Sequence, residues 1–410
     1  MEALTYSTVA VTLGLVVTRP RIGPRFRLSP AVAALAGVAL LAAFGSVRLG
    51  DVGWAAQTMW RPLLGIVSIM LMTGVARRAG VLEGVADLVF ARANGSPLRV
   101  FALVFGFGAI TAAVLNNDSA ILLLTPLVVD AAKKRHRTLV MPLAFAVFLS
   151  AGVAPLIVSN PMNMVVASVS GIGFNEYAAR MILPALAGWL VTFGVAFLIF
   201  RRMIAVAPRD ESVHANGEKT SLDRGQKVIL VALAAVVLAY PIVSWLGGPV
   251  WMVAACGALF LLGLGARQGH RPSEIAKHEI HFDVLVFLVA VLVLSIGLRN
   301  VGLVGRLAHV YEGAGPLRVG AVSALGSAIL NNHPMGLLNM MALEGSGHRN
   351  VLAALVGGDL GPRLFPMGSL AGLLWLEMLR RSGVEVSVRR FVMVGALATL
   401  PTLAACLMLL

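Results

Sequence analysis

At Val114-Leu115-Asn116-Asn117-Asp118-Ser119-Ala120 the sequence places four polar side chains inside an apolar run that extends from 100 to 132. As one straight helix this run would be about 50 Å long, whereas the hydrocarbon core of a bilayer is about 30 Å thick. Basic residues stand at both ends, Arg99 before the run and a cluster at 133–137 after it. Such flanks mark the cytoplasmic side, so both ends are expected on one side. This predicts a re-entrant hairpin over 97–133 with the polar segment at its tip.

The same polar pattern returns in the second half of the chain. Leu330-Asn331-Asn332 repeats the Leu-Asn-Asn of the first tip. Its approach, Gly315-Pro316-Leu317-Arg318-Val319, also repeats Ser96-Pro97-Leu98-Arg99-Val100. Because the matches occur in the same order, they predict two structural repeats and a second hairpin over 316–344.

The composition identifies a polytopic membrane protein. Of 410 residues, 58% are hydrophobic and 13% are charged, against about 25% charged in ordinary soluble proteins. Orientation signals on the cytoplasmic side account for the net charge of +14, so membrane lipid is expected as a partner and nucleic acid is not. The two cysteines, Cys256 and Cys406, form no metal-binding spacing, and no nucleophile–base pair is evident. No metal, no cofactor and no enzymatic activity are therefore expected.

The apolar runs and basic loops predict an all-α fold of about ten transmembrane helices. The first repeat would occupy 1–204 and the second 227–410, joined by a cytoplasmic linker over 205–226. The runs 138–172 and 350–380 are each interrupted by proline, glycine or polar residues, which predicts two broken helices of the kind that build transporter sites. Both termini are expected outside the cell (inner) membrane. The hairpins would then open from opposite sides, so the repeats would be inverted.

The polar positions at the tips and breaks form the candidate solute site, expected around one cavity near the midplane. Asparagine offers donors and acceptors without charge, which suits a small polyhydroxylated or oxyanionic solute. Helix N-termini after each tip add backbone donors. The alternative is that the asparagines only cap half-helices. The expected substrate-binding residues are Asn116, Asn117, Ser159, Asn160, Asn163, Asn331, Asn332, Gly368 and Ser369.

Asp118 and Asp359 are the acids of these motifs. A charged carboxyl at membrane depth is costly, so burial favours its neutral form, and both residues are candidates to carry protons. The alternative is a structural role, as a cap or, for Asp359, in an ion pair with Arg363. His333 would either titrate near neutrality or serve to cap or pack.

These motifs resemble those of the arsenite/antimonite efflux permeases, the arsenical-resistance pump family of the ion transporter superfamily. The resemblance covers nearly the whole chain, and the matching segments are 117–126, 155–160, 173–178, 331–332 and 358–376. It implies export of trivalent arsenic and antimony hydroxides in exchange for protons, sometimes with a cytoplasmic ATPase partner. It also implies a scaffold with a moving, elevator-type transport domain. Departures from the family pattern fall at the tips and bear on specificity and pH dependence rather than on class: Asn116, Ser119 and His333.

Three alternatives stay open from the sequence. One is a sodium- or proton-coupled carboxylate or ion transporter of the same superfamily, although the Ser-Asn-Thr signature expected for carboxylates is absent from both tips. The others are a passive channel and the membrane subunit of an ATPase-driven arsenite pump. The chain has no nucleotide-binding motif, so ATP use would require a partner. The oligomeric state is open between monomer and homodimer.

Overall fold

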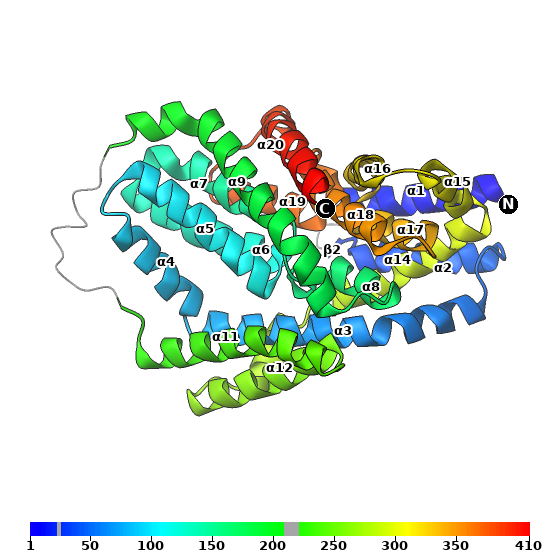
Figure 1. The fold of residues 1–410 in the computed structure, drawn as a ribbon, viewed down its shortest axis with the longest axis horizontal. Coiled ribbons are helices and arrows are strands. Elements are labelled where there is room, and N and C mark those ends of the chain that lie inside the picture. Colours follow the sequence, from blue (N-terminus) through cyan, green and yellow to red (C-terminus); the bar gives the residue numbers. More distant parts are fainter. Residues whose placement is uncertain (23–25, 209–220) are drawn as a thin grey trace.

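The computed structural model describes residues 1–22, 26–208 and 221–410, and its regular structure is almost entirely helical (Figure 1). A short antiparallel ribbon follows the first helix and consists of β1 (Arg21–Ile22) and β2 (Phe26–Arg27). The helices of the first half are α1 (Glu2–Thr18), α2 (Pro30–Ala43), α3 (Leu49–Arg78), α4 (Val81–Arg92), α5 (Pro97–Leu115), α6 (Asn117–Arg135), α7 (Val140–Ser150), α8 (Pro161–Val169) and α9 (Phe174–Val206). Those of the second half are α11 (Arg224–Trp245), α12 (Val250–Arg267), α13 (Pro272–Glu279), α14 (Phe282–Asn300), α15 (Leu303–Tyr311), α16 (Pro316–Leu330), α17 (Asn332–Ala342), α18 (His348–Leu360), α19 (Leu370–Arg381) and α20 (Val388–Leu409).

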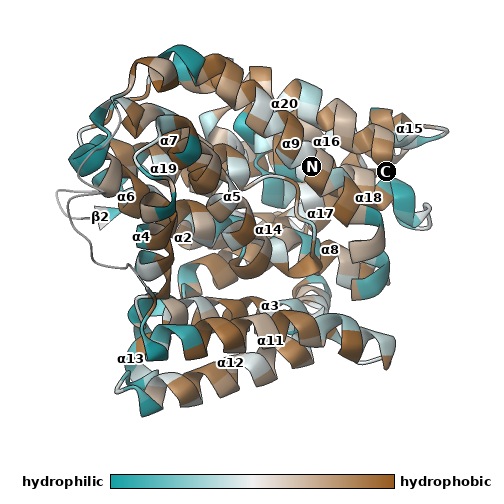
Figure 2. Ribbon diagram, turned by 60° about the vertical axis from the view of Figure 1, so that its left-hand side comes forward, coloured by the Kyte–Doolittle hydropathy of each residue, from teal (hydrophilic) through white to brown (hydrophobic). Residues whose placement is uncertain are grey.

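Seven helices of the described chain are long and apolar enough to cross a membrane: α3, α5, α9, α11, α12, α14 and α20. Their outward faces are apolar, as Figure 2 shows along α11 and α12. Leu190, Leu238 and Leu259 on three of these helices are more than half exposed, which suits a lipid rather than a water environment. The ten spans expected from sequence are therefore not ten long helices. Helices α1 and α2 are shorter, and two other expected spans are interrupted.

The polar tips are turns between paired helices. Helix α5 gives way to α6 at Asn116, where φ is 109°, and α16 gives way to α17 at Asn331, where φ is 82°. With ψ of 157° and 150°, both residues lie outside the left-handed helical region that asparagine adopts readily, in a part of positive φ that residues other than glycine seldom occupy. Each Asn side chain then accepts a hydrogen bond from a backbone N–H of the following helix, Ser119 at 2.8 Å or His333 at 3.3 Å. The sequence thus stops one helix and caps the next at the same residue.

Both expected breaks interrupt helical structure. Helix α7 ends at Ser150 and α8 begins only at Pro161, while α18 ends at Leu360 and α19 begins at Leu370. Pro161 occupies the first turn of α8, where a missing N–H costs nothing. The side chains of Asn160 and Ser369 cap the helices that follow. The expected linker is shorter than 205–226, because α9 continues to Val206 and α11 starts at Arg224, and residues 209–220 lie outside the described part.

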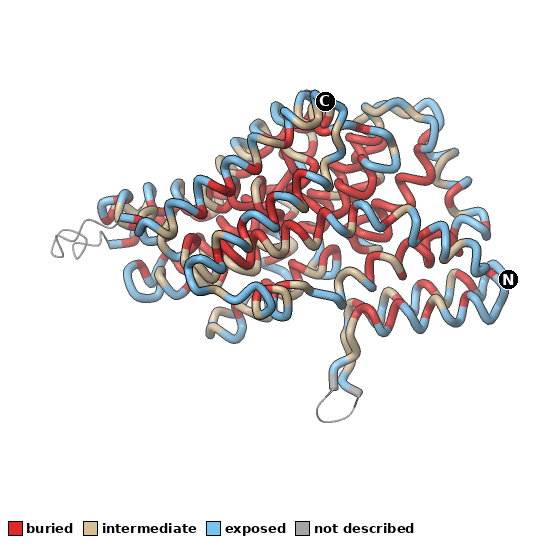
Figure 3. Tube along the Cα trace, turned by 90° about the horizontal axis from the view of Figure 1, so that it is seen from below, coloured by how far each residue is buried: buried red, intermediate tan, exposed pale blue. Residues whose placement is uncertain are grey.

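The paired and broken helices lie in the interior of the bundle. Helices α3, α11 and α12 pack side by side along one edge, and α1, α2 and α14 form a second packed group (Figures 1 and 2). Between these groups, α6 of the first half packs on α19 of the second, and α17 of the second half packs on α8 of the first. Figure 3 shows the buried residues concentrated in this interior. The two halves therefore interlock where their helices are interrupted.

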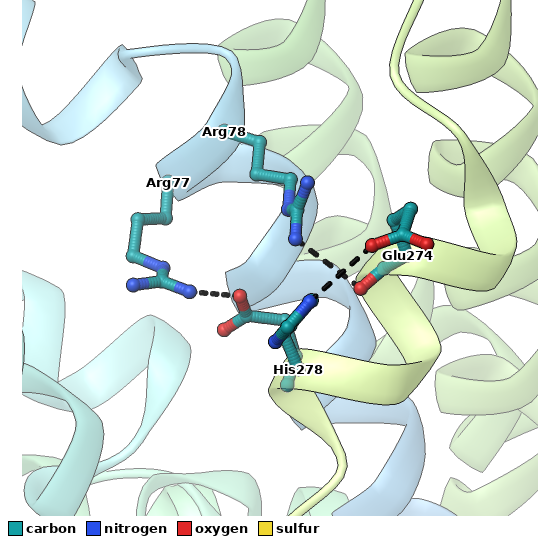
Figure 4. Close-up of polar contacts among 5 residues, drawn as sticks. Arg77, Arg78, Glu274 and His278 are labelled. Carbon is teal, nitrogen blue, oxygen red and sulfur yellow. Dashed lines mark hydrogen bonds and ion pairs between the residues drawn. The ribbon is translucent and has the colours of Figure 1, made fainter.

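A polar contact joins the end of α3 to α13, across the two halves (Figure 4). Arg77 forms an ion pair with Glu279, whose side chain is largely buried. The Arg78 guanidinium donates to the backbone carbonyl of Glu274 at 3.2 Å, and the Glu274 carboxylate lies 3.3 Å from His278. Gly74 leaves room for the Glu279 side chain, because a Cβ at that position would overlap it. This contact anchors the longest helix of the α3–α11–α12 edge.

Replacing Gly357 with alanine is expected to destabilise the protein by about 1–3 kcal/mol, the usual cost of overpacking. A Cβ at Gly357 would overlap the carbonyl oxygen of Gly320 and lie 2.8 Å from the Ala324 nitrogen, because α18 packs tightly on α16. The adjacent Gly358 is the control, since its Cβ would meet nothing closer than 3.9 Å. Thermal unfolding of the two purified variants checks this, and equal unfolding temperatures would contradict it.

Candidate solute-binding site

One cavity lies where the two helix pairs and the two breaks meet. It is lined by Asn117 and Asn332, the second asparagine of each tip. Asn160 and Ser369 contribute from the breaks. The N-termini of α6, α8, α17 and α19 thus line one cavity, and each carries backbone N–H groups and a positive partial charge. The arrangement suits a small solute rich in oxygen.

The other expected binding residues have structural roles. Asn116 and Asn331 are the caps described above. Ser159 is buried and donates to the Ala113 carbonyl at 2.8 Å. Gly368 sits where a Cβ would lie 2.6 Å from the Cα of Pro362. The capping alternative therefore describes the first asparagine of each tip, and the solute-facing prediction describes the second.

Asp359 is held by three N–H donors, all from the first half of the chain. Its carboxylate accepts from the backbone of Ala154 at 3.0 Å, from the amide of Asn160 at 2.6 Å and from the amide of Asn163 at 3.1 Å. No acceptor in the described chain faces this carboxylate. Hydrogen bonds to a carboxylate stabilise its charged form, so these three donors offset part of the cost of burying that charge. The expected ion pair with Arg363 is not formed within 4.0 Å among the described residues.

Tyr177 completes this network and was missed at the sequence level. Its hydroxyl accepts from Asn163 at 2.8 Å and donates to the Ala154 carbonyl at 3.1 Å. Asn163 therefore uses both amide hydrogens, one on Tyr177 and one on Asp359. The segment 173–178 carried the family resemblance, but nothing in its spacing indicated that the tyrosine reaches the break between α7 and α8.

Asp118 lines the same cavity as Asp359 but differs in its hydrogen bonding. It is half-buried at the start of α6 and has no hydrogen-bond or ion-pair partner in the described chain. Its neighbour Asn117 donates to the Gly152 carbonyl at 2.9 Å. The two acids that line the cavity therefore differ: Asp359 accepts from three donors, and Asp118 accepts from none in the described chain.

His333 does not line the cavity. It is buried, its ring nitrogen lies 3.3 Å from the Asn331 side-chain oxygen, and its ring packs edge-on against Phe287. Of the alternatives for His333, its position agrees with a packing role at the tip.

Further cavities connect the site to one end of the bundle. An adjoining cavity shares Asn160, Asn332 and Asp359 with the first and extends along α17 to Met340. A third shares Met340 and reaches Glu344, with Arg299 and His348 also in its lining. Cavities that share lining residues thus lie in sequence from the site towards the loop between α17 and α18.

Known proteins with similar sequences decide the family. The family model described as "Arsenical pump membrane protein" matches residues 5–410. The chain belongs to this family. An arsenical pump membrane protein of Escherichia coli strain K12 is 29% identical over 96% of this chain and 94% of its own length. That of Yersinia enterocolitica is also 29% identical, over 97% and 95%.

Solved structures share the fold of this arsenical pump family member at low identity. The Alcanivorax borkumensis YdaH transporter superposes with a TM-score of 0.58 at 17% identity, covering 100% of this chain and 97% of that one. Neisseria gonorrhoeae MtrF, from a class of antimetabolite efflux pumps, gives 0.55 at 11%, covering 99% and 93%. With the apolar helices, these results identify a multi-pass membrane transporter of the arsenical pump type.

Proposed function

We propose that this protein exports arsenite and antimonite from the cytoplasm in exchange for protons. The observation that carries the proposal is the cavity at the junction of the helix pairs, lined by amides, a hydroxyl and two acids of unlike surroundings. Trivalent arsenic binds thiolates tightly, and a carrier must release its cargo. Cys256 is exposed and Cys406 donates to the Pro184 carbonyl, so neither thiol holds the solute. Family membership supports the substrate class.

Proton coupling is assigned to Asp118. The trihydroxide is neutral near pH 7, so the membrane potential alone does not drive it, and a charge must move in return. Asp118 borders the solute cavity without a partner of its own. Its protonation would change the hydrogen bonding offered to the solute, and proton and solute would compete. Asp359 is the second candidate, but its three donors stabilise the carboxylate and favour a structural role.

The architecture proposed for this exchange is a pair of inverted repeats that work as an elevator. Helices α3 to α9 and α14 to α20 follow the same order: a long helix, a short one after a glycine of positive φ (Gly80 or Gly302), a helix pair, a broken helix and a long helix. The pairs would be re-entrant hairpins of a moving domain, and α3, α11 and α12 part of its scaffold. With both termini outside the inner membrane, the route past Glu344 would open outward.

Protease added to inside-out vesicles is expected to cut the linker within 205–226. The reason is orientation: Arg201 and Arg202 precede the linker and Arg224 and Lys227 follow it, and basic flanks favour the cytoplasmic side. A protease site engineered into the outer loop at 246–249 is the control and should stay intact. Protection of the linker, with cleavage at 246–249, would reverse the topology.

Uptake of arsenite into inverted vesicles tests the proposed function directly. Uptake should require a pH gradient with the vesicle interior acidic, and it should not require ATP. A protonophore should abolish it. Uptake that needs ATP and a cytoplasmic ATPase would instead favour the pump-subunit alternative. Carboxylate uptake without arsenite uptake would favour the alternative of a carboxylate transporter of the same superfamily. Downhill leakage unaffected by pH would indicate a channel.

A further inference from the structure

Arg363 has hydrogen-bonding capacity that the protein does not use. It lies in the break between α18 and α19, is 3% exposed and lines the solute cavity. Its Nη2 donates to the Leu149 carbonyl, but its Nε and Nη1 are buried and have no partner among the described residues. Buried guanidinium groups are normally satisfied, because an unused charged donor is costly. These donors are therefore available to a ligand.

Asn332 carries the complementary unused group. Its side-chain oxygen is buried without a partner in the described chain, and the residue lines the same cavity as Arg363. One wall thus offers cationic N–H donors and another offers a neutral acceptor. A ligand that satisfies both needs a negatively charged oxygen and a hydroxyl.

The charges around the cavity favour a monoanion. The helix N-termini of α6, α8, α17 and α19 contribute positive partial charge. The Asp359 carboxylate is occupied by its three N–H donors. Arg363 forms no ion pair within 4.0 Å in the described chain, and its nearby countercharge, Asp359, is engaged by those donors.

We infer that Arg363 and Asn332 form a subsite for a small trigonal oxyanion that carries a hydroxyl, such as the singly deprotonated trihydroxide. The inference rests on the proposed function for the location of the solute. When the neutral trihydroxide meets ionised Asp118, one solute O–H bond breaks and an O–H bond forms on the Asp118 carboxyl. The solute oxygen keeps the electron pair and binds Arg363, and the total charge in the cavity is unchanged.

Three trigonal probes of similar size separate charge from hydroxyl recognition: bicarbonate, nitrate and boric acid. Full-length protein in lipid nanodiscs is titrated near neutral pH at constant ionic strength, with calorimetry as the readout. Bicarbonate should bind about tenfold or more tightly than boric acid, because hydrogen bonds to a charged group are stronger than neutral ones. Nitrate should fall between them, since it has charge but no hydroxyl for Asn332. Boric acid binding as tightly as bicarbonate would overturn the inference.

Variants assign each preference to its residue. Arg363→Gln should remove the preference for bicarbonate over boric acid, and Asn332→Leu should make bicarbonate and nitrate equal. Arg380→Gln, which removes an exposed arginine of α19 paired with Glu377, should keep the wild-type order, and a loss of preference there too would count against the subsite. If Arg363→Gln does not fold, the order measured on the wild type decides.

Different results would overturn the proposed function and the oxyanion subsite. Arsenite uptake by wild-type vesicles, together with equal binding of bicarbonate and boric acid, would retain the transport function and remove the oxyanion subsite. Anion binding that depends on Arg363, without arsenite transport in any vesicle assay, would retain the subsite and remove the proposed function.

Discussion

Replacing Asp118 with asparagine is expected to abolish pH-driven arsenite uptake while leaving the fold largely intact. Asparagine preserves the size of the side chain and cannot carry the exchanged proton. Because no described residue bonds to Asp118, the substitution breaks no protein contact. A carrier locked in one protonation state should not concentrate arsenite across the vesicle membrane. Uptake with and without a pH gradient measures the difference.

Asp130 provides the matched control, since it lies on the same helix α6 and is exposed. Asp130→Asn should retain pH-driven uptake. If Asp118→Asn still concentrates arsenite with normal pH dependence, Asp118 is not the proton carrier. If Asp359→Asn alone removes the pH dependence, the two acids exchange roles.

Asp359→Leu is expected to reduce the stability of the protein by about 3–5 kcal/mol, the cost of leaving buried charged and polar groups without their partner. It would deprive Asn160, Asn163 and the Ala154 N–H of their common acceptor. It would also leave the buried Arg363 without a nearby countercharge. Thermal unfolding in detergent, with expression level as a second readout, checks the prediction.

Asp118→Leu is the control for this loss of stability, because it removes an acid from the same cavity without removing a hydrogen-bond acceptor that the protein uses. Both acids line the same space, yet only Asp359 is hydrogen-bonded. The Asp118 variant should unfold close to the wild-type temperature, and Asp359→Asn, which keeps one acceptor oxygen, should fall between wild type and Asp359→Leu. Equal unfolding temperatures for the two leucine variants would show that the Asp359 network contributes nothing to stability.

Local chemistry explains which features the sequence predicted. Asn116 and Asn331 mark the tips because each side chain caps the helix that follows, and Pro161 suits the first turn of α8. These are effects of a residue on its own neighbours. The family resemblance, which the match over residues 5–410 confirms, rests on the same motifs.

Long-range packing explains what the sequence did not reveal. Nothing local distinguishes Asn116 from Asn117, and only the packing of α6 against the break brings Asn117 to the Gly152 carbonyl. Tyr177 was overlooked because its partners lie on other elements of the fold: Ala154 lies in the irregular segment of the break and Asn163 lies on α8. Arg363 was considered only as a partner of Asp359, although the fold turns it towards the Leu149 carbonyl and the cavity. Seven helices of the described chain are long enough to cross a membrane, because α1 and α2 are shorter and two of the ten expected spans are broken, as the sequence predicted.

The sharing of Asp359 between the two halves also governs how the protein is made. Asn160 and Asp359 are 199 positions apart, and a ribosome adds about 5–20 residues each second. The amide donors of the first break therefore lack their carboxylate acceptor for roughly 10–40 s, until Asp359 has been synthesised. During this interval the half-made chain holds unpaired polar groups at a depth where hydrocarbon cannot satisfy them. Assembly of the cavity is thus a late event in biogenesis, and a chain terminated before Asp359 would present a clear signal to the proteases that survey the membrane.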